Sequence, residues 1–369
     1  MFPTRAMTIL GGDSFRDEYS LAFDGTNDNI RIPEIEYDVQ SSNVSFTYWA
    51  KRANADNVYA ILGHTSYANQ AYIRHIADGT VKIESDSNGD VANITPVSTD
   101  FNWHHYVIAC SSGTVTAYQD GVACSVSGDV NGNVLTVDTI GGQSTGGVVY
   151  EWFGNISEIA VYNIALSSSQ AKQIYNGREP FDHKDWAKTG NLTQWWRMGD
   201  GRLDDRNSEF EHIGDEVNPT IGSELVANGA FDTEVEGGNW QVSATSGANN
   251  WAISGGTMNH TDDGSNDTVQ SRQTSVVTTG KIYKVSYDIT AFTSGSVHVD
   301  LGDSGTGVGT TRTAVGSYSE FLMATNTFVD IEPADGTVLS VDNVSVKLVG
   351  GSSGVCINMD TDDFVGDTP

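Results

Sequence analysis

The chain has 369 residues, and at about 150 residues per domain this length predicts two or three domains with cores of their own. It carries 19 Lys and Arg against 48 Asp and Glu, so its formal net charge is −29. Because such a surface repels phosphates, we expect no nucleic-acid partner. With 38% hydrophobic and only 18% charged residues, the chain is also too apolar for a disordered acidic protein, and we expect it to fold.

The chain contains 40 glycines, and Asp-Gly and Asn-Gly dipeptides occur repeatedly along its length. These dipeptides favour tight hairpin turns. The N-terminal residues lack an apolar run of the length that a signal peptide needs, and nowhere do 18 apolar residues follow one another. We therefore expect a protein without a cleaved signal peptide and without membrane insertion.

The first unit extends from about residue 19 to residue 177 and consists of short segments in which polar and apolar residues alternate. This period of two predicts an antiparallel sheet protein. Residues 166–177 differ, because they begin with a Ser…Gln capping box and end with Asn-Gly. They predict a short helix, Ser168–Tyr175.

A second β-rich unit follows after a change of composition. Residues 182–221 place three tryptophans among charged residues and predict a mostly irregular connector. Residues 222–350 are rich in Thr, Ser and Gly, and their turn spacing fits a sandwich or jelly roll. The sequence therefore predicts an all-β protein, in which two antiparallel β-sandwich (jelly-roll) domains, 1–181 and 222–350, are joined by a Trp-rich connector.

Motifs of the first unit occur in a characteristic order. They are residues 20–30, 44–51, 103–107, 118–121, 140–142 and 153–162, followed by the predicted helix. In this order the chain resembles laminin-G-like, concanavalin A-like lectin domains over about residues 19–180. The resemblance implies a two-sheet sandwich that binds sugars or proteins, often with a calcium ion at one edge. Asp24 and Glu158 would then contribute to the calcium site, although Asp24 also suits a plain Asp-Gly turn.

The second unit contains motifs of a different family. They are residues 224–232, 238–240, 280–287 and 341–346. Over residues 223–349 the chain resembles carbohydrate-binding modules of the family 4/9/22 type. The resemblance implies a structural calcium held by Asp232 and Asp342, which would offset the loop-closure entropy between the first and last strands. In the alternative, Asp232 caps a turn and Asp342 faces solvent.

Sugar binding in such modules uses aromatic faces for stacking and polar side chains for the edges of the sugar ring. In the second unit we expect this role for Trp251, Tyr287, His298 and Tyr318. The alternative is that these aromatic residues belong to the core of the sandwich.

Catalysis is not expected. Glucanases of the same sandwich class carry acidic residues at alternate positions of one strand, where they act as nucleophile and acid. The nearest candidates here, Glu34 and Glu36, follow Pro33 and are predicted to lie in a solvated loop before the strand. We therefore expect a protein that is not an enzyme.

The combination of the two units also resembles a known arrangement. A laminin-G-like domain, the connector motif WWRMGDG and a carbohydrate-binding-module-like jelly roll together resemble structural proteins of tailed-phage virions. This implies a non-enzymatic virion surface protein, made in the host cytoplasm, whose partners are host-surface glycans, other virion proteins and further copies of itself. Two alternatives stay open: a purely structural subunit that binds no sugar, and an accessory protein of polysaccharide degradation.

The C-terminal tail allows two interpretations. Its Gly/Ser-rich and acidic composition is typical of a linker and a frayed end. However, residues 192–201 contain more apolar side chains than so short a segment can bury, and residues 355–359 and 364–365 offer apolar partners. We therefore expect residues 351–369 to complete the connector, with the second jelly roll inserted between two halves of one unit.

Overall fold

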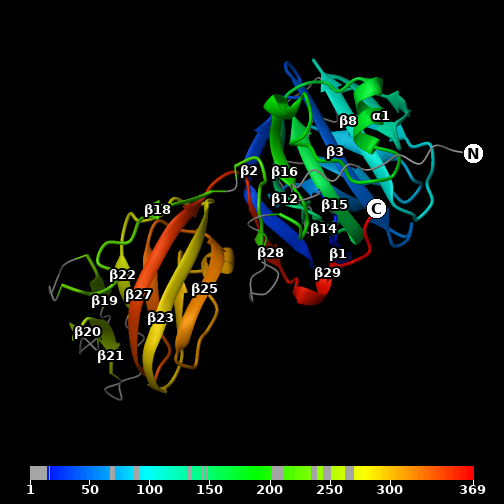
Figure 1. The fold of residues 1–369 in the computed structure, drawn as a ribbon. Coiled ribbons are helices and arrows are strands. Elements are labelled where there is room, and N and C mark those ends of the chain that lie inside the picture. Colours follow the sequence, from blue (N-terminus) through cyan, green and yellow to red (C-terminus); the bar gives the residue numbers. More distant parts are fainter. Residues whose placement is uncertain are drawn as a thin grey trace, which may run out of the picture.

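The computed structural model describes residues 15, 17–66, 71–85, 91–130, 134–142, 144–145, 148–201, 204, 212–218, 220–233, 239–243, 251–261 and 270–369. These residues form two antiparallel β-sandwiches, which confirms the predicted all-β fold class (Figure 1). Among the described residues, no helix combines the length and the apolar character needed to cross a membrane.

The first sandwich consists of two large sheets and a small hairpin. One sheet contains, in spatial order, β10 (Val122–Ala123), β9 (Thr114–Gln119), β8 (His104–Ser111), β3 (Asn43–Arg52), β15 (Phe153–Tyr162), β1 (Ser20–Asp24) and β29 (Phe364–Val365), and β16 (Leu192–Trp196) also pairs with β15. The other contains β11 (Ser125–Ser127), β7 (Val91–Thr95), β6 (Val81–Glu84), β5 (Tyr72–His75), β4 (Tyr59–Gly63), β12 (Leu135–Ile140), β2 (Asn29–Tyr37), β28 (Gly354–Ile357) and β17 (His212–Ile213). The hairpin pairs β13 (Ser144–Thr145) with β14 (Val148–Val149).

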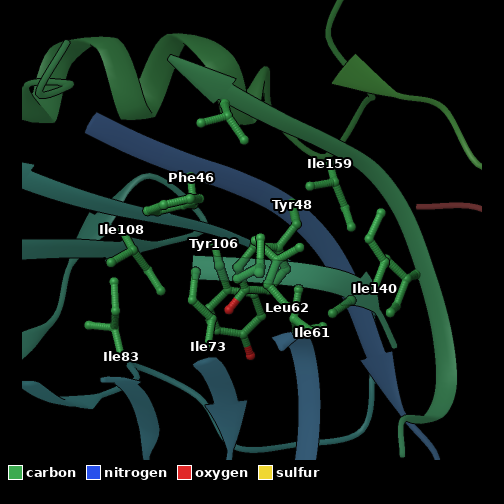
Figure 2. Packing of buried hydrophobic residues seen from close by; sticks show 14 of the residues in the cluster. Phe46, Tyr48, Ile61, Leu62, Ile73, Ile83, Tyr106, Ile108, Ile140 and Ile159 are labelled. Carbon is green, nitrogen blue, oxygen red and sulfur yellow. The ribbon is translucent and has the colours of Figure 1, made fainter. Parts of the chain in front are cut away.

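The core of this sandwich follows from the alternation of side chains along each strand. Phe46 and Tyr48 of β3 and Ile108 of β8 are fully buried, as are Ile61 and Ile73 of the opposite sheet. Figure 2 shows these side chains gathered in one apolar layer between the sheets. Burial of such side chains stabilises the fold by roughly 1.5–3 kcal/mol for each residue.

A single α-helix in the described part of the chain covers the outer side of the first sheet. It is α1 (Ser168–Tyr175), which begins at the capping box of Ser167 and Gln170 and ends at Asn176 in the left-handed conformation, φ 51°. The predicted helix is therefore confirmed. Its buried residues Ala171 and Ile174 pack in a second apolar cluster with residues of β8, β15 and β16.

Two distant stretches of the chain complete the first sandwich. Strands β16 and β17 precede the second sandwich in sequence, whereas β28 and β29 follow it. β28 pairs with β2, and β29 pairs with β1. β17 and β28 are neighbours in the sheet, so the two ends of the second sandwich lie side by side (Figure 1). The sequence predicts a mostly irregular connector, but the connector contributes two strands, β16 and β17, to the first sandwich. On β16, Trp196 points into the core between the sheets, and Trp195 points to the opposite side, into the apolar cluster under α1.

The second sandwich also consists of two sheets. The first contains, in spatial order, β20 (Trp251–Ser254), β21 (Thr257–His260), β27 (Val338–Val349), β23 (Ile282–Ser294) and β25 (Gly316–Met323), and β18 (Ile221–Glu224) also pairs with β27. The second contains β19 (Gln241–Ser243), β22 (Gln270–Gln273), β26 (Val329–Pro333) and β24 (Val297–Asp300). The described residues also include three 3₁₀ turns: η1 (Thr189–Asn191), η2 (Gly305–Gly307) and η3 (Thr361–Asp363).

The two sandwiches contact each other through the outer side of β28 and β17. Cys356 points into the first core, so its neighbours on β28 point outward. Of these, Val355 packs with Phe321 and other apolar residues of the second sandwich. Beside it, the ring of His212 stacks on the ring of Phe321, with 3.9 Å between ring centroids. This contact determines how the two sandwiches face each other.

Candidate functional site

A pocket lies at the junction of the two sandwiches, and we call it the junction pocket. Asn29, Arg31 and residues 356–359 of the first sandwich line it, together with residues 304–306 and Thr325 of the second. Its volume is about 600 Å³. Ligand sites of small molecules have volumes of roughly 300–1,000 Å³ and favour the interfaces between domains.

Hydroxyl and amide groups supply the polar lining of the junction pocket. The Thr306 hydroxyl donates to the Met323 carbonyl at 3.2 Å, and the Thr325 hydroxyl donates to the Ser304 carbonyl at 3.1 Å. Each hydroxyl retains acceptor capacity for a ligand. The Oδ1 atom of Asn29 is buried without a hydrogen-bond partner. The Thr306 and Thr325 hydroxyls can therefore accept hydrogen bonds from a polyhydroxylated molecule, whereas Asn29 Oδ1 is not accessible to it.

Arg31 supplies the positive charge of the pocket. It lies on β2 opposite Thr139 on one side and Val355 on the other. Because its neighbours Ile30 and Ile32 point into the core, Arg31 points outward, where it is half-buried. Within the described part of the chain, its guanidinium makes no ion pair, hydrogen bond or ring contact. A half-buried arginine that stays unpaired in a chain with 48 acidic residues is available to an anionic ligand.

The aromatic residues predicted to bind sugar do not form a binding surface. Trp251 and Tyr287 are only 3% and 1% exposed and belong to the core of the second sandwich. Tyr318 packs against Tyr287, and its hydroxyl donates to the Ala314 carbonyl at 2.8 Å. The buried rings of Trp251 and Tyr287 have no free face for stacking on a sugar, so the core alternative describes these two residues, whereas Tyr318 is half-buried. His298 lies on the outer face of the other sheet.

The predicted calcium pair of the first sandwich is not brought together. Asp24 lies opposite Phe153 on β15, and Glu158 lies five residues further along that strand, where the pairing of β15 with β3 shifts register. Glu158 is buried, accepts a hydrogen bond from the Trp195 indole at 2.5 Å and forms an ion pair with Arg197 at 3.1 Å. Burial, together with the charge of Asp17, raises the pKa of Glu158. The sequence prediction of Glu158 as a calcium ligand is therefore wrong: it is a buried partner of Arg197.

Asp24 has other acidic neighbours that sequence reasoning missed. The Asp24 amide donates to Asp28 Oδ2 at 2.7 Å. Burial raises the pKa of Asp28 to about 6, and the charges of Asp24 and Asp363 add to this effect. Asp363 comes from the tail, so no local sequence signal links it to Asp24. The Asp24 carboxylate itself accepts from the Thr26 amide at 2.7 Å, as the alternative of a plain Asp-Gly turn predicts.

The predicted calcium pair of the second sandwich lies near the point where the first and last segments of the unit meet. The Val344 amide donates to the Gly229 carbonyl at 2.9 Å, so the first and last segments of the unit meet close to Asp342. Asp342 is half-buried and accepts from the Asn343 amide at 2.7 Å. Asp232 is exposed. Calcium binding by Asp232 and Asp342 stays a prediction.

Residues 24–172 match the Laminin_G_3 model, the concanavalin A-like lectin/glucanases superfamily. The match confirms the laminin-G-like resemblance for this part of the chain, which is less than half of its length. Comparison with curated proteins gives no match.

Three solved structures illustrate the proteins to which the chain is similar. A SAP-like pentraxin from Limulus polyphemus shares 17% identity over 43% of this chain and 82% of its own, with a TM-score of 0.35. A putative carbohydrate-binding protein from Bacteroides ovatus shares 16% identity over 54% of this chain and 56% of its own, with a TM-score of 0.39. Tailspike protein 2 from Escherichia coli O157:H7 bacteriophage CAB120 shares 11% identity over 51% and 31%, with a TM-score of 0.29. None of these values supports an argument about function.

The acidic residues considered for catalysis lie within a strand of the laminin-G-like sandwich. Glu34 and Glu36 belong to β2, which corrects the prediction that they precede it in a loop. Both are exposed, and Glu34 Oε2 lies 3.1 Å from His64 Nε2. Alternation puts the two carboxylates on the same outward face, and neither is buried among apolar groups.

Proposed function

We propose that this chain is a non-enzymatic glycan-binding protein of a virion surface, a decoration, fibre or tail-associated component whose junction pocket holds a sugar of the host surface. The observation that carries the proposal is the unpaired guanidinium of Arg31 among hydroxyl and amide groups between two sandwiches. The laminin-G-like match of residues 24–172 supports it, because that superfamily includes lectins.

The chemistry of the pocket favours a sugar that carries a carboxylate. Hydroxyl and amide groups hydrogen-bond the edges of a sugar ring, while Ile357 and Met359 supply apolar contact. A guanidinium binds a carboxylate through two parallel hydrogen bonds, which neutral sugars cannot match. We therefore expect a uronic or sialic acid in the pocket.

The virion location is supported by the arrangement of the domains around the WWRMGDG motif. In this proposal the protein is made in the host cytoplasm and is incorporated at the particle surface, where it contacts other virion proteins and further copies of itself. Its net charge of −29 favours solubility at high local concentration. Electron microscopy of purified particles with a labelled antibody against this chain tests the location directly.

We also propose structural calcium in each sandwich. In the first, we propose Asp24, Asp28 and Asp363 as ligands, because the charges of Asp24 and Asp363 act on the buried carboxyl of Asp28. In the second, Asp342 and Asp232 fit it with the carbonyl oxygens of the segments that meet at Gly229 and Val344. Oxygen ligands from carboxylates and backbone carbonyls are the set that calcium takes.

A glycan array tests the proposed ligand. We expect the wild-type chain to bind glycans that end in a carboxylate-bearing sugar, and we expect Arg31→Gln to weaken that binding at least about 10-fold, since a hydrogen-bonded charge contributes about 1.5–3 kcal/mol. Arg178→Gln, which alters an exposed arginine away from the pocket, is the matched control and should bind like wild type.

Other outcomes decide between the alternatives. If neither wild type nor variants bind any glycan, the sandwiches serve as purely structural subunits. Release of reducing sugar from a polysaccharide by the wild-type chain, lost in Glu34→Gln, would replace the proposal with an enzymatic function.

A further inference from the structure

Polar side chains lie on the outer face of the smaller sheet of the second sandwich. Val297 and Val299 of β24 and Ile331 of β26 point into the core, so the residues between them point outward. The register places His298 directly opposite Glu332 and Asp300 directly opposite Asp330. The outward positions of β24 and β26 are thus all ionisable.

Three of these side chains converge. His298, Asp300 and Glu332 each offer a ligand atom, and these three atoms lie within 4.8 Å of one another. His298 Nε2 lies 3.1 Å from Asp300 Oδ2. His298 and Asp300 are two residues apart on one strand and Glu332 is across from His298, so the backbone itself holds all three on one face.

Partners outside the trio orient its carboxylates. The Gly309 amide donates to Asp300 Oδ1 at 2.8 Å, which leaves Oδ2 directed toward His298. The Gln270 side chain donates to Glu332 Oε2 at 2.8 Å. Hydrogen bonds of this kind fix the orientation of carboxylates and imidazoles that hold metal ions.

The electrostatics of this face favour a cation. Asp300 and Asp330 are opposite each other with side chains only 4% and 1% exposed, and like charges in this position destabilise a sheet. The Nε atom of Arg272 lies 2.6 Å from Asp330 Oδ1. Arg272 is thus hydrogen-bonded to Asp330, and the carboxylates of Asp300 and Glu332 lie beside His298, where a metal cation would offset their negative charge.

We propose that His298, Asp300 and Glu332 bind a divalent transition-metal ion of the zinc class. One imidazole nitrogen and two carboxylate oxygens suit Zn²⁺, whereas Ca²⁺ and Mg²⁺ take oxygen ligands. Ligands about 2.1 Å from a tetrahedral ion lie about 3.4 Å from one another, so small rotations of the half-buried Glu332 close the site. Water would complete the tetrahedron. The ion joins β24 to β26, and the proposal is independent of glycan binding at the junction pocket.

His104 provides a comparison within the same chain. It also contacts two carboxylates, Asp100 through Nε2 at 3.0 Å and Asp120 through Nδ1 at 2.7 Å. These contacts use opposite nitrogens of the ring, so one ion cannot reach the ring and both carboxylates. His104 is therefore the matched control: like His298 it lies beside two carboxylates, but its geometry does not allow one ion to bind all three groups.

Titration of the untagged, metal-free chain with ZnCl2, followed by calorimetry, tests the site. We expect one Zn²⁺ per chain, with affinity lowered at least about 10-fold in His298→Gln and in Glu332→Gln and unchanged in His104→Gln. Co²⁺ bound to the wild-type chain should give the visible absorption of a tetrahedral site, absent from His298→Gln. Circular dichroism of each variant without metal checks that it folds, which we expect because His298 and Glu332 are half-buried at the surface.

Three results would overturn the inference. These are absence of Zn²⁺ binding by the folded wild-type chain, binding that His298→Gln leaves unchanged, and binding that His104→Gln weakens as much as His298→Gln does. A parallel titration with CaCl2 separates this site from the proposed calcium sites, since His298→Gln should leave Ca²⁺ binding unchanged.

Discussion

Phe364 provides a direct test of how the C-terminal tail contributes to the first sandwich. It begins β29, lies opposite Leu21 of β1 and is only 8% exposed. It belongs to the same core as Met198 of the connector, and its ring lies beside Gly199. The variant Phe364→Ala removes this ring while leaving the backbone pairing of β29 possible.

The expected cost can be estimated from the burial of Phe364. Truncation of a buried phenylalanine to alanine destabilises proteins by about 3–5 kcal/mol. Since β29 is a two-residue edge strand that can relax toward the cavity, we expect the lower end, about 3 kcal/mol. This is a large share of a typical domain stability of about 5–15 kcal/mol. Phe101→Ala is the matched control: Phe101 is 45% exposed, and its main contact is the Arg52 guanidinium 5.7 Å away. We expect it to cost about 1 kcal/mol or less.

Urea unfolding followed by tryptophan fluorescence measures this difference. Six of the eight tryptophans precede residue 200, so the signal reports mainly on the first sandwich. With a denaturant slope of about 3 kcal/mol/M, Phe364→Ala should lower the midpoint by about 1 M. If Phe364→Ala and Phe101→Ala shift the midpoint equally, the tail does not contribute to the core and the proposed two-part domain fails.

Two further predictions concern titration and metal binding. Burial lowers the pKa of His105 to about 3, so only the unfolded state takes up a proton as the pH falls below about 6.5. Wild type should therefore lose about 2 kcal/mol relative to His105→Gln between pH 7.5 and pH 5, as measured by urea unfolding at each pH, and a pH-independent difference would refute this. Millimolar CaCl2 should raise the melting temperature of wild type, and should raise it less in Asp28→Asn and Asp342→Ala. An identical melting curve with a chelator contradicts the calcium proposal.

The parts of the fold that depend on local sequence were predictable. The capping box of Ser167 and Gln170 defines the start of α1 through contacts three residues apart. The alternation of side chains along a strand also indicates which residues are buried. Tyr287 points to the same side of β23 as the buried Val285 and Ile289, which indicates that it is a core residue. By the same criterion, Arg31 between Ile30 and Ile32 points outward. The prediction that Tyr287 binds sugar considered only that it is aromatic and not the side of the strand on which it lies.

Long-range pairing was harder to predict. Nothing near Asp24 in the sequence indicates that the charge of Asp363 acts on it. The two come together because β29 pairs with β1, and this pairing depends on residues far apart in the chain. The acidic composition of the tail also favoured a frayed end, although Phe364 is buried. The metal trio required the register of β24 against β26, since only that register places Glu332 beside His298.

The junction pocket depends on the way in which the second sandwich is attached. Two segments of the chain cross between the sandwiches, and the Asp215 carboxylate joins them by accepting from the Val217 amide and from the Ser352 amide, both at 3.0 Å. The Gly350 amide then donates to the Thr220 carbonyl at 2.8 Å. Domains joined by a single linker usually move relative to each other. Here two mutually bonded crossings and an apolar contact oppose such motion, so both walls of the pocket are in place before a ligand arrives. A preorganised pocket loses less entropy on binding, which in the proposed function would let a single arginine and a few hydroxyl groups hold a small sugar.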